Sequence, residues 1–296
     1  MPIKKLYQEE QIDSPLGHLW HAFASNPFAV AGLWAVIFLL LLVVFGPLLA
    51  PFQPETQNPN AILLPPSWDA AGHVSHFLGT DDLGRDLFSR ILHGVRLTFG
   101  MSLIVVICAL VVGFIIGSLS GMMRGLKSSI LGHLLDALLS IPSLLLAILV
   151  VAVTGPGLTN VFWAVGIALT PQFVRAIHQA VHEELQKEYV TAAKLDGASQ
   201  VQIFWYVIMP NVWDVVIIQT TIAISVAILD IAALGFLNLG AQAPSSEWGS
   251  MIFQGLSSLL IAPWTITIPG LAILFTVLSI NLVGDGLRSA LAPIRN

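Results

Sequence analysis

The sequence is poor in charge and has almost no cysteine. Only 10% of its 296 residues are Asp, Glu, Lys or Arg, whereas about 25% is usual in soluble domains. A chain with so little charge cannot cover a globule with solvated side chains, which excludes a soluble protein. The single cysteine, Cys108, excludes an intrachain disulfide and a multi-cysteine metal site. The formal net charge of −5 is spread along the chain, without the basic cluster expected of a nucleic-acid-binding protein.

Long hydrophobic runs take the place of the missing charge. A transmembrane helix needs about 20 largely apolar residues, and 56% of this chain is hydrophobic. Six stretches qualify: Phe28–Leu49, Thr98–Gly121, Leu134–Val153, Leu158–Ile177, Val212–Asn238 and Trp264–Gly284. The first is interpreted as a retained anchor, because its apolar run is longer than that of a cleaved signal peptide. The sequence therefore predicts an all-α integral membrane protein with six spans.

The positions of the basic residues indicate how these spans are oriented across the membrane. With a cytoplasmic N-terminus, only Arg85, Arg90 and Arg96 lie outside the cell. The other nine then lie inside: Lys4, Lys5, Arg124, Lys127, Arg175, Lys187, Lys194, Arg288 and Arg295. Since positively charged residues concentrate in cytoplasmic segments, we expect both termini to be cytoplasmic.

The expected external segment, residues 50–97, changes character along its length. Its first part carries prolines that favour extended chain. From Leu83, apolar residues recur at helical spacing, and the polar residues opposite them are Arg85, Asp86, Ser89, Arg90 and His93. Thr80 is the expected N-cap, with i, i+4 ion pairs between Asp81 and Arg85 and between Asp86 and Arg90. This short amphipathic helix is either an outer gate or docking surface, or a helix lying on the lipid interface.

The expected cytoplasmic segment His178–Asn211 is too long to be a simple connector. Its pattern predicts a helix over Glu183–Leu195 that Gly197 stops in the left-handed conformation. Ser199 and Gln202 form the capping box of a second helix, which Pro210 should end at Met209. Two short helices joined at a glycine are suited to insertion into a groove of a partner.

Within this segment, the run EYVTAAKLDGAS at 188–199 and the run VIMP at 207–210 resemble the cytoplasmic loop of permease subunits in binding-protein-dependent ABC transporters. The Ala pair, the Gly and the closing Pro match the family's spacing. Thr191 departs from the Glu that the family usually has there, although Glu188 lies one turn earlier. The resemblance implies an ATPase-coupling loop that includes Glu188, Thr191, Ala192, Ala193, Gly197, Ser199 and Pro210.

Other stretches are similar to the dipeptide and oligopeptide branch of this family. They are FLGTDDLGRD (77–86), SIPSLLLAI (140–148), LGFLNLG (234–240), EWGSM (247–251) and NLVGDGL (281–287). Three more, at 64–68, 195–199 and 229–236, most resemble the C subunits of the Sap branch. The resemblance implies the type I ABC importer (MetI-like) permease fold with an extra N-terminal helix. The expected boundaries are a cytoplasmic segment 1–27, a first helix 28–49, a periplasmic loop 50–97, a core 98–287 with the coupling loop 178–211, and a cytoplasmic tail 288–296.

The function implied by this resemblance is that of a non-catalytic permease subunit in the bacterial inner membrane. It would form half of a pathway for peptides, antimicrobial peptides included, as a heterodimer with a homologous permease, and two ABC ATPase subunits would supply the energy. A periplasmic solute-binding protein is a further expected partner. The sequence has no G-x-x-x-x-G-K-[ST] motif, so ATP is expected only on the partner subunits. A polyamine (putrescine) exporter of the same architecture is the alternative.

Few other residues suggest chemistry. Asp230 is the one acidic residue expected deep in a span, where it either lines the translocation path or pairs with a polar group of the partner permease. His178 and His182 have metal-pair spacing but lack the Glu of a zinc protease motif, so neither a metal site nor a catalytic residue is expected. An ion-coupled secondary transporter is the rival from another class, which several embedded acids would favour.

Small residues and prolines within the spans predict close helix contacts and kinks. Gly113, Gly117 and Gly121 in the second span follow the small-xxx-small spacing of tight helix contacts. Pro142 in the third span and Pro269 in the sixth are expected to kink their helices.

Overall fold

The computed structural model describes residues 15–123 and 126–291, and every regular element within these two ranges is helical. In chain order the elements are α1 (Pro15–Ala24), α2 (Pro27–Leu49), α3 (Leu87–Val95), the π-helical segment η1 (Arg96–Gly100), α4 (Met101–Gly121), α5 (Leu126–Leu139), α6 (Ser143–Thr154), α7 (Leu158–Glu184), α8 (Glu188–Leu195), α9 (Gln200–Gln202), the π-helical segment η2 (Ile203–Ile208), α10 (Met209–Phe236), α11 (Trp248–Gly255), the 3₁₀ segment η3 (Leu256–Ser258) and α12 (Trp264–Leu291). Of the predicted cytoplasmic segments 1–27 and 288–296, residues 1–14 and 292–296 lie outside the described ranges.

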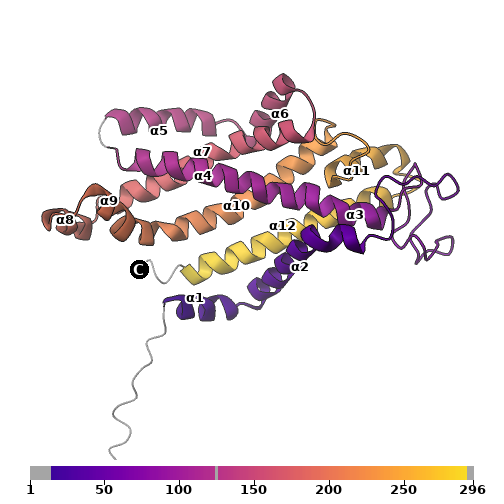
Figure 1. Ribbon diagram of the computed structural model, residues 1–296, viewed down its shortest axis with the longest axis horizontal. Coiled ribbons are helices and arrows are strands. Elements are labelled where there is room, and N and C mark those ends of the chain that lie inside the picture. The colour runs from indigo at the N-terminus through magenta and orange to yellow at the C-terminus, as the bar shows by residue number, and fades with distance from the viewer. Residues whose placement is uncertain (1–14, 124–125, 292–296) are drawn as a thin grey trace, which may run out of the picture.

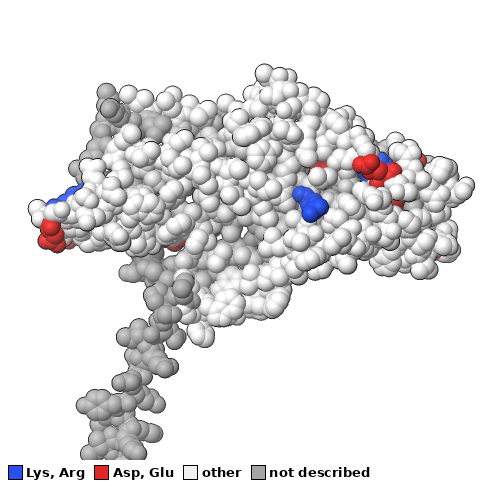
Figure 2. All heavy atoms as spheres, in the orientation of Figure 1, with Lys and Arg blue, Asp and Glu red and all other residues white. Residues whose placement is uncertain are grey.

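Most of the long helices run side by side along the long axis of the molecule (Figure 1). The short helices α8 and α9 project at one end, whereas α3, α11 and the segment 50–86 lie at the other. On the face shown in Figure 2, charged atoms gather near these two ends, apart from one basic side chain, and the middle is uncharged. An uncharged belt between two charged ends is what a bilayer requires of a protein that crosses it.

Within the described residues, five helical stretches are long and apolar enough to cross a membrane, and a bent pair of helices makes a sixth if it is counted as one span. The five are Pro27–Leu49, Leu87–Gly121, Leu158–Glu184, Gln200–Phe236 and Trp264–Leu291. Each contains one of the predicted spans or nearly all of it, and several extend well beyond it. The first begins at Asn26, whose side chain accepts hydrogen bonds from the N–H groups of Phe28 and Ala29 at 3.0 and 3.3 Å, as an N-cap does.

The third predicted span, Leu134–Val153, is broken at Pro142, so the kink expected there is confirmed and is sharp. It consists of α5 and α6, whose axes are bent by 84° at residues 140–142. Pro142 has the extended dihedrals φ −55° and ψ 137°. Its ring also excludes the preceding Ile141 from helical geometry. An ion pair between Arg175 of α7 and Asp136 of α5 connects α5 to the bundle.

The centre of the bundle is the contact between α4 and α7, which the predicted glycine stripe makes possible. A Cβ atom on Gly117 would lie 2.8 Å from the carbonyl oxygen of Val174, and one on Gly121 would lie 2.8 Å from the Cβ of Val181. A Cβ atom on Gly113 would likewise clash with the Cβ of Phe173. Backbones that approach this closely leave no room for a side chain, so the packing interpretation of the stripe is confirmed.

The helix α1 is not predicted from the sequence. Its buried Phe23 packs against Ala29 of α2 and Ala290 of α12, and its ring lies next to Gly286. α1 therefore fastens the start of the first spanning helix to the last one.

We expect Gly117→Ala to destabilise the protein, because its methyl group would meet a backbone oxygen of α7 and force the two helices apart. The cost of such overpacking is about 1–3 kcal/mol, measurable as a lower melting temperature in detergent. Gly166→Ala is the matched control, since its Cβ has only Val105 Cγ1 near it, at 3.9 Å. Equal melting temperatures for the two variants would contradict this account of the α4–α7 contact.

Candidate functional site

The segment between α7 and α10 leaves the bundle at Glu184, so the predicted helix Glu183–Leu195 starts too early. Residues 185–187 form a turn in which the N–H of Lys187 donates to the carbonyl oxygen of Glu184 at 3.2 Å. The carboxylate of Glu184, which is buried, pairs with Lys187 Nζ at 2.7 Å. Lys187 itself is extended, with φ −72° and ψ 148°. This turn separates α8 from α7, and α8 then follows over Glu188–Leu195.

Gly197 ends α8 in the predicted left-handed conformation, with φ +85°. The N–H of Gly197 donates to the carbonyl oxygen of Lys194 at 3.1 Å, and the N–H of Ala198 donates to that of Ala193 at 3.1 Å. These two bonds make a Schellman motif, which satisfies the last carbonyl groups of α8. No atom lies within 4 Å of a Cβ added at Gly197. Only the backbone conformation, not space, therefore calls for glycine there.

The capping box after the glycine is also confirmed. The N–H of Ser199 donates to Gln202 Oε1 at 2.9 Å, and the N–H of Gln202 donates to Ser199 Oγ at 3.3 Å. Together α8, the turn at Gly197 and α9 form a bent pair of short helices, residues 188–202, called here the elbow.

The prediction that Pro210 ends the second helix is wrong. The helix continues without interruption from Gln200 to Phe236, over 37 residues. The π-helical segment η2 lies directly before Pro210, and π-helical segments of this kind commonly relieve strain in a helix. Proline is also tolerated in the first turn of α10, where it sits. The second helix of the elbow, α9, is therefore the start of the same helix as the fifth span.

Apolar side chains of the elbow and of η2 face away from the protein. Leu195 is 83% exposed and Tyr206 is 81% exposed, while Val190 and Ile203 anchor the segment in the core. A groove of about 370 Å³ follows the bend, lined by Asp196, Gly197, Ala198, Gln202, Tyr206 and Val207. Of the residues predicted to form the loop site, Ala193 is half-buried and the rest are exposed: Glu188, Thr191, Ala192, Gly197, Ser199 and Pro210. A protein surface of this kind, with apolar groups beside a groove, fits a docked partner.

Asp230 is buried in the bundle, in the half of α10 farther from the elbow. It is 6% exposed, and its Oδ2 atom is buried without a hydrogen-bond partner among the described residues. Five residues earlier, Ser225 Oγ donates to Asn281 Oδ1 of α12 at 2.9 Å. A buried carboxylate oxygen without a partner is costly. It therefore needs a proton, a cationic group or a donor from another chain.

The two histidines of α7 contact each other and the neighbouring helix α4. The rings of His178 and His182 stack with their centroids 5.9 Å apart. His178 Nδ1 is 2.9 Å from the hydroxyl oxygen of Ser120 on α4. This contact joins α7 to α4 at the end of the bundle that carries the elbow.

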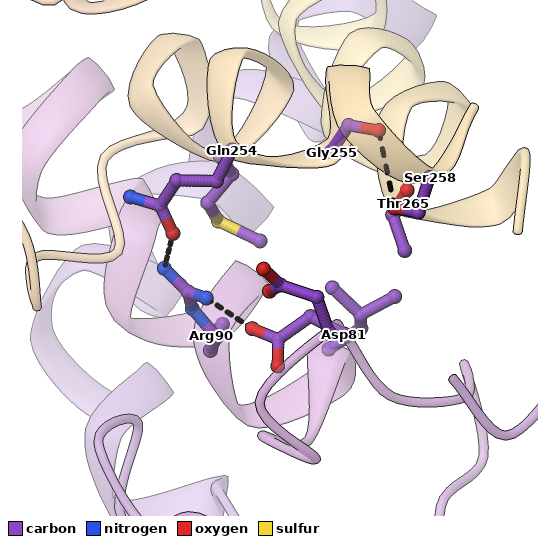
Figure 3. Close-up of a pocket in the computed structure, with 9 residues that line it drawn as sticks. Asp81, Arg90, Gln254, Gly255, Ser258 and Thr265 are labelled. Atoms are coloured by element: carbon purple, nitrogen blue, oxygen red, sulfur yellow. Dashed lines mark hydrogen bonds and ion pairs between the residues drawn. The ribbon is translucent and has the colours of Figure 1, made fainter. Parts of the chain in front are cut away.

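A buried polar network at the opposite end corrects the prediction for the amphipathic helix. Arg85 and Arg90, expected on an outward polar face, are 3% and 1% exposed. Arg85 Nε donates to Asp81 Oδ2 at 2.7 Å, as predicted, and Arg90 contacts the same oxygen. Both guanidinium groups also donate to Gln254 Oε1 of α11, Arg85 at 2.9 Å and Arg90 at 3.0 Å. Figure 3 shows the contacts of Arg90 with Gln254 and Asp81. The helix is thus clamped to α11, and the interpretation as a helix lying on lipid is wrong.

Asp86, rather than Thr80, is the N-cap of α3. Its carboxylate accepts from the N–H of Ser89 at 2.8 Å and lies 3.0 Å from His76 Nδ1. The predicted pair between Asp86 and Arg90 therefore does not form. Thr80 instead accepts a hydrogen bond from the N–H of Leu64 at 2.9 Å, which holds the preceding loop in place.

Glu247, another buried acid of this end, has a structural role that is not predicted from the sequence. Its two oxygens accept four hydrogen bonds, from the N–H of Gly249, the N–H and hydroxyl of Ser250, and the hydroxyl of Thr98. Burial raises the pKa of the Glu247 carboxyl above its usual range, and these donors act against that rise. Thr98 also accepts from the N–H of Trp248 at 3.1 Å. The signal in the sequence is an acid at the N-cap position before Trp-Gly-Ser.

Two family models match the chain. The model of the binding-protein-dependent transport system inner membrane component covers residues 109–294. The model of the N-terminal TM domain of oligopeptide transport permease C covers residues 14–66.

Curated relatives match over nearly the whole length. The peptide transport system permease protein SapC of Salmonella typhimurium strain LT2 is 49% identical over 291 residues, which is 98% of either chain. The di/tripeptide transport system permease protein DppC of Pseudomonas aeruginosa is 43% identical and covers 95% of this chain and 92% of its own.

Among solved structures, a chain of the inward-facing MetNI methionine ABC transporter has a similar fold. Its TM-score is 0.55 at 18% identity, over 68% of this chain and 96% of that one. At this identity the similarity concerns the fold alone.

We expect Glu247→Gln to loosen the contact of α11 with η1, since the amide retains one acceptor oxygen for four donors. Whichever way the amide turns, its NH₂ group faces a backbone N–H. Leaving such buried donors unsatisfied costs about 1–3 kcal/mol, detectable as a lower melting temperature of the purified protein. The same change at the exposed Glu55 is the control. A Glu247→Gln variant as stable as the control would show that the four bonds contribute nothing.

Proposed function

The chain belongs to the family of binding-protein-dependent transport system inner membrane components, and from this membership we propose that it forms half of the transmembrane pathway of an ATP-driven peptide transporter. It is a multi-pass protein of the inner membrane. The elbow is the observation that carries the proposal, because it offers a rigid, partly apolar docking surface at one end of a bundle of spanning helices.

The partner proposed for the elbow is an ABC ATPase subunit. ATP would bind there and not on this chain, whose sequence lacks the phosphate-binding G-x-x-x-x-G-K-[ST] motif. The proposed complex contains two such ATPases, a homologous permease that completes the pathway, and a soluble substrate-binding protein. The exposed residues Glu188, Thr191 and Ala192 of α8 and the groove beside Gly197 would contact the ATPase.

Transport would couple to ATP hydrolysis through the helix that begins in the elbow. Closure of the ATPase pair moves the two docked elbows together. Because Gln200–Phe236 is one uninterrupted helix, the displacement of α9 is carried into the span that contains Asp230. The pathway then opens towards the other side of the membrane.

The proposed orientation places the elbow and both termini in the cytoplasm. Lys187 lies just before α8 and Lys194 lies in its last turn, both at the end that carries the elbow. Both arginines of the described segment 51–95 are buried at the opposite end. Short cytoplasmic segments are enriched in Lys and Arg, which supports this direction.

Peptides are the proposed substrates, since SapC and DppC are peptide and di/tripeptide permeases by name. Neither these relatives nor the similar fold of MetNI favours the polyamine exporter or the ion-coupled transporter considered from the sequence. The carboxylate of Asp230, with a buried oxygen that lacks a partner among the described residues, would attract the cationic groups of a peptide.

The elbow can be tested at Gly197 without creating a clash. Gly197→Val forces a β-branched residue into a left-handed conformation that costs about 1–2 kcal/mol, so we expect the bend to open. In the reconstituted complex, ATPase co-purification and transport of a labelled peptide should both fall. Gly197→Asn is the matched control, because Asn tolerates this conformation, and it should retain most of both activities. Unchanged docking and transport in Gly197→Val would reject the elbow as the ATPase contact.

Asp230→Asn tests the role of the buried carboxylate. The amide has the size of the carboxylate but lacks its charge, so assembly with the ATPases should be retained. We expect uptake of a cationic peptide into proteoliposomes to fall about tenfold, the effect of losing about 1.4 kcal/mol of interaction. Uptake of a neutral peptide is the internal control. If both peptides are transported at the rate of the unaltered protein, Asp230 does not contact the substrate.

A further inference from the structure

One face of the last spanning helix is left uncovered by the described residues. α12 lies between α2 and α10 (Figure 1), and Gly32 of α2 and Thr221 of α10 pack against its two sides, at Leu282 and Gly284. The stripe that neither helix covers carries an exposed residue every three or four positions: Leu271, Leu274, Leu278, Asn281, Asp285 and Arg288. The motif NLVGDGL (281–287) therefore begins where this stripe changes from apolar to polar.

The change to polar residues takes place within the span. α12 has 28 residues, whereas about 20 suffice to cross the hydrocarbon. Trp264 marks the end of α12 opposite the elbow, where its Nε1 donates to the carbonyl oxygen of Thr80 at 3.1 Å. About 20 residues counted from Trp264 extend past Asn281. An exposed amide at this depth loses its hydrogen bonds if it faces lipid, so it calls for water, a substrate or another chain.

The amide of Asn281 is oriented by the neighbouring helix. Ser225 Oγ of α10, which is buried, donates to Asn281 Oδ1 at 2.9 Å. The hydroxyl groups of Thr276 and Ser279 on α12 instead donate to carbonyl oxygens of their own helix, at 2.8 and 2.7 Å. Because Ser225 binds the amide oxygen, the NH₂ group of Asn281, which has no acceptor among the described residues, can donate to a group outside this chain.

One turn nearer the elbow, Asp285 presents a carboxylate on the same stripe. Asp285 and Arg288 are both exposed, and neither forms an ion pair with a described residue. Charged residues are depleted from the core of protein interfaces, whereas a hydrated surface tolerates them unpaired. The polar part of the stripe therefore suits a water-filled path better than the centre of a contact between permeases.

The amino-terminal end of a peptide complements Asn281 and Asp285. Side chains four residues apart on a helix have Cβ atoms about 5–6 Å apart, so the two can contact adjacent groups of one ligand. A carboxylate binds an ammonium group through a charge-assisted hydrogen bond. The carbonyl oxygen of the first peptide bond lies next to that ammonium group and can accept from an amide NH₂.

We propose that Asn281 and Asp285 bind the amino-terminal end of a peptide in the translocation pathway, and that Ser225 is the positioning residue that orients the Asn281 amide. The inference rests on the proposed function, which supplies the peptide and the pathway. Asp285 pairs with the ammonium group, and Asn281 donates to the first carbonyl oxygen. Contacts of this kind accept peptides of different sequence and require a free amino terminus.

Transport by the complete reconstituted complex is the first test, with labelled trialanine, trilysine and trileucine as probes. We expect Asp285→Asn and Asn281→Leu each to lower the rate of ATP-driven uptake about tenfold, as loss of one hydrogen bond to a charged group or of a comparable contact does. Ser225→Ala should lower the rate in the same direction, and Ser225→Thr, which keeps the hydroxyl group, should restore it. Glu183→Gln is the matched control, because Glu183 is an exposed acid at the same end of the bundle but lies on α7.

Thiol labelling tests whether the stripe faces water and whether a peptide covers it. The complex carries Cys108→Ser, which removes the one cysteine of this chain, partner subunits without cysteine, and Leu278→Cys as the reporter one turn from Asn281. We expect a charged, membrane-impermeant methanethiosulfonate reagent to modify this reporter. Ile107→Cys is the matched control that the reagent should not reach, since Ile107 is apolar and 57% exposed but lies on α4.

The same reporter measures recognition of the amino terminus. The tripeptide that is taken up fastest should slow the labelling of the Leu278→Cys variant several-fold. Its N-acetylated form, which has no ammonium group, should not. Adding Asp285→Asn or Asn281→Leu to the reporter should abolish the protection.

The outcomes separate this inference from the proposed function. If the unaltered complex takes up none of the three tripeptides when ATP is supplied, the proposed function fails. If it takes them up and the Asn281 and Asp285 variants match Glu183→Gln, only the contact proposed here fails. A Leu278→Cys reporter that the charged reagent does not reach would place the stripe against lipid. Loss of the second permease from Asn281→Leu complexes would make it a contact between permeases, and either result would overturn the proposal.

Discussion

A peptide group in hydrocarbon can hydrogen-bond only within the protein, and this requirement decides where the chain can turn. The elbow meets it at the end of the bundle, where Gly197 allows the last carbonyl groups of α8 to find N–H partners in the turn itself. The break at Pro142 lies between two helices that make one span if they are counted together. Each interruption is thus either closed by local hydrogen bonds or placed where neighbouring groups can serve the freed backbone.

The end opposite the elbow is organised by buried charge. Asp81 joins two arginines that also share Gln254 of α11, and Glu247 collects four donors around the start of the same helix. Pairing and hydrogen bonds stabilise a buried charge, and in these networks Arg90 Nε is left without a hydrogen-bond partner among the described residues. The two networks therefore fix the loop, α3 and α11 in one arrangement, and they leave the exposed surface to acidic and aromatic side chains.

The sequence predicted well whatever depends on neighbouring residues or on composition. Long apolar runs located the spans, and the glycine and capping signals located the turn at Gly197 and Ser199. The predictions from sequence failed where the structure depends on a residue distant in the chain or on a rare backbone conformation. Arg90 is buried because Gln254, which is 164 residues away, accepts its hydrogen bond. Pro210 does not end its helix because a π-helical segment precedes it. The buried Oδ2 of Asp230 has no hydrogen-bond partner among the described residues, and one sequence does not identify groups outside the chain that could pair with it.

The uninterrupted helix from Gln200 to Phe236 constrains how this chain can change over evolutionary time. Each residue of an α-helix advances the side chains by about 100° around its axis. A single inserted residue anywhere between the elbow and Asp230 would rotate the carboxylate by that angle relative to the docked partner. Insertions and deletions in this stretch should therefore be eliminated by selection, even where any individual substitution is accepted.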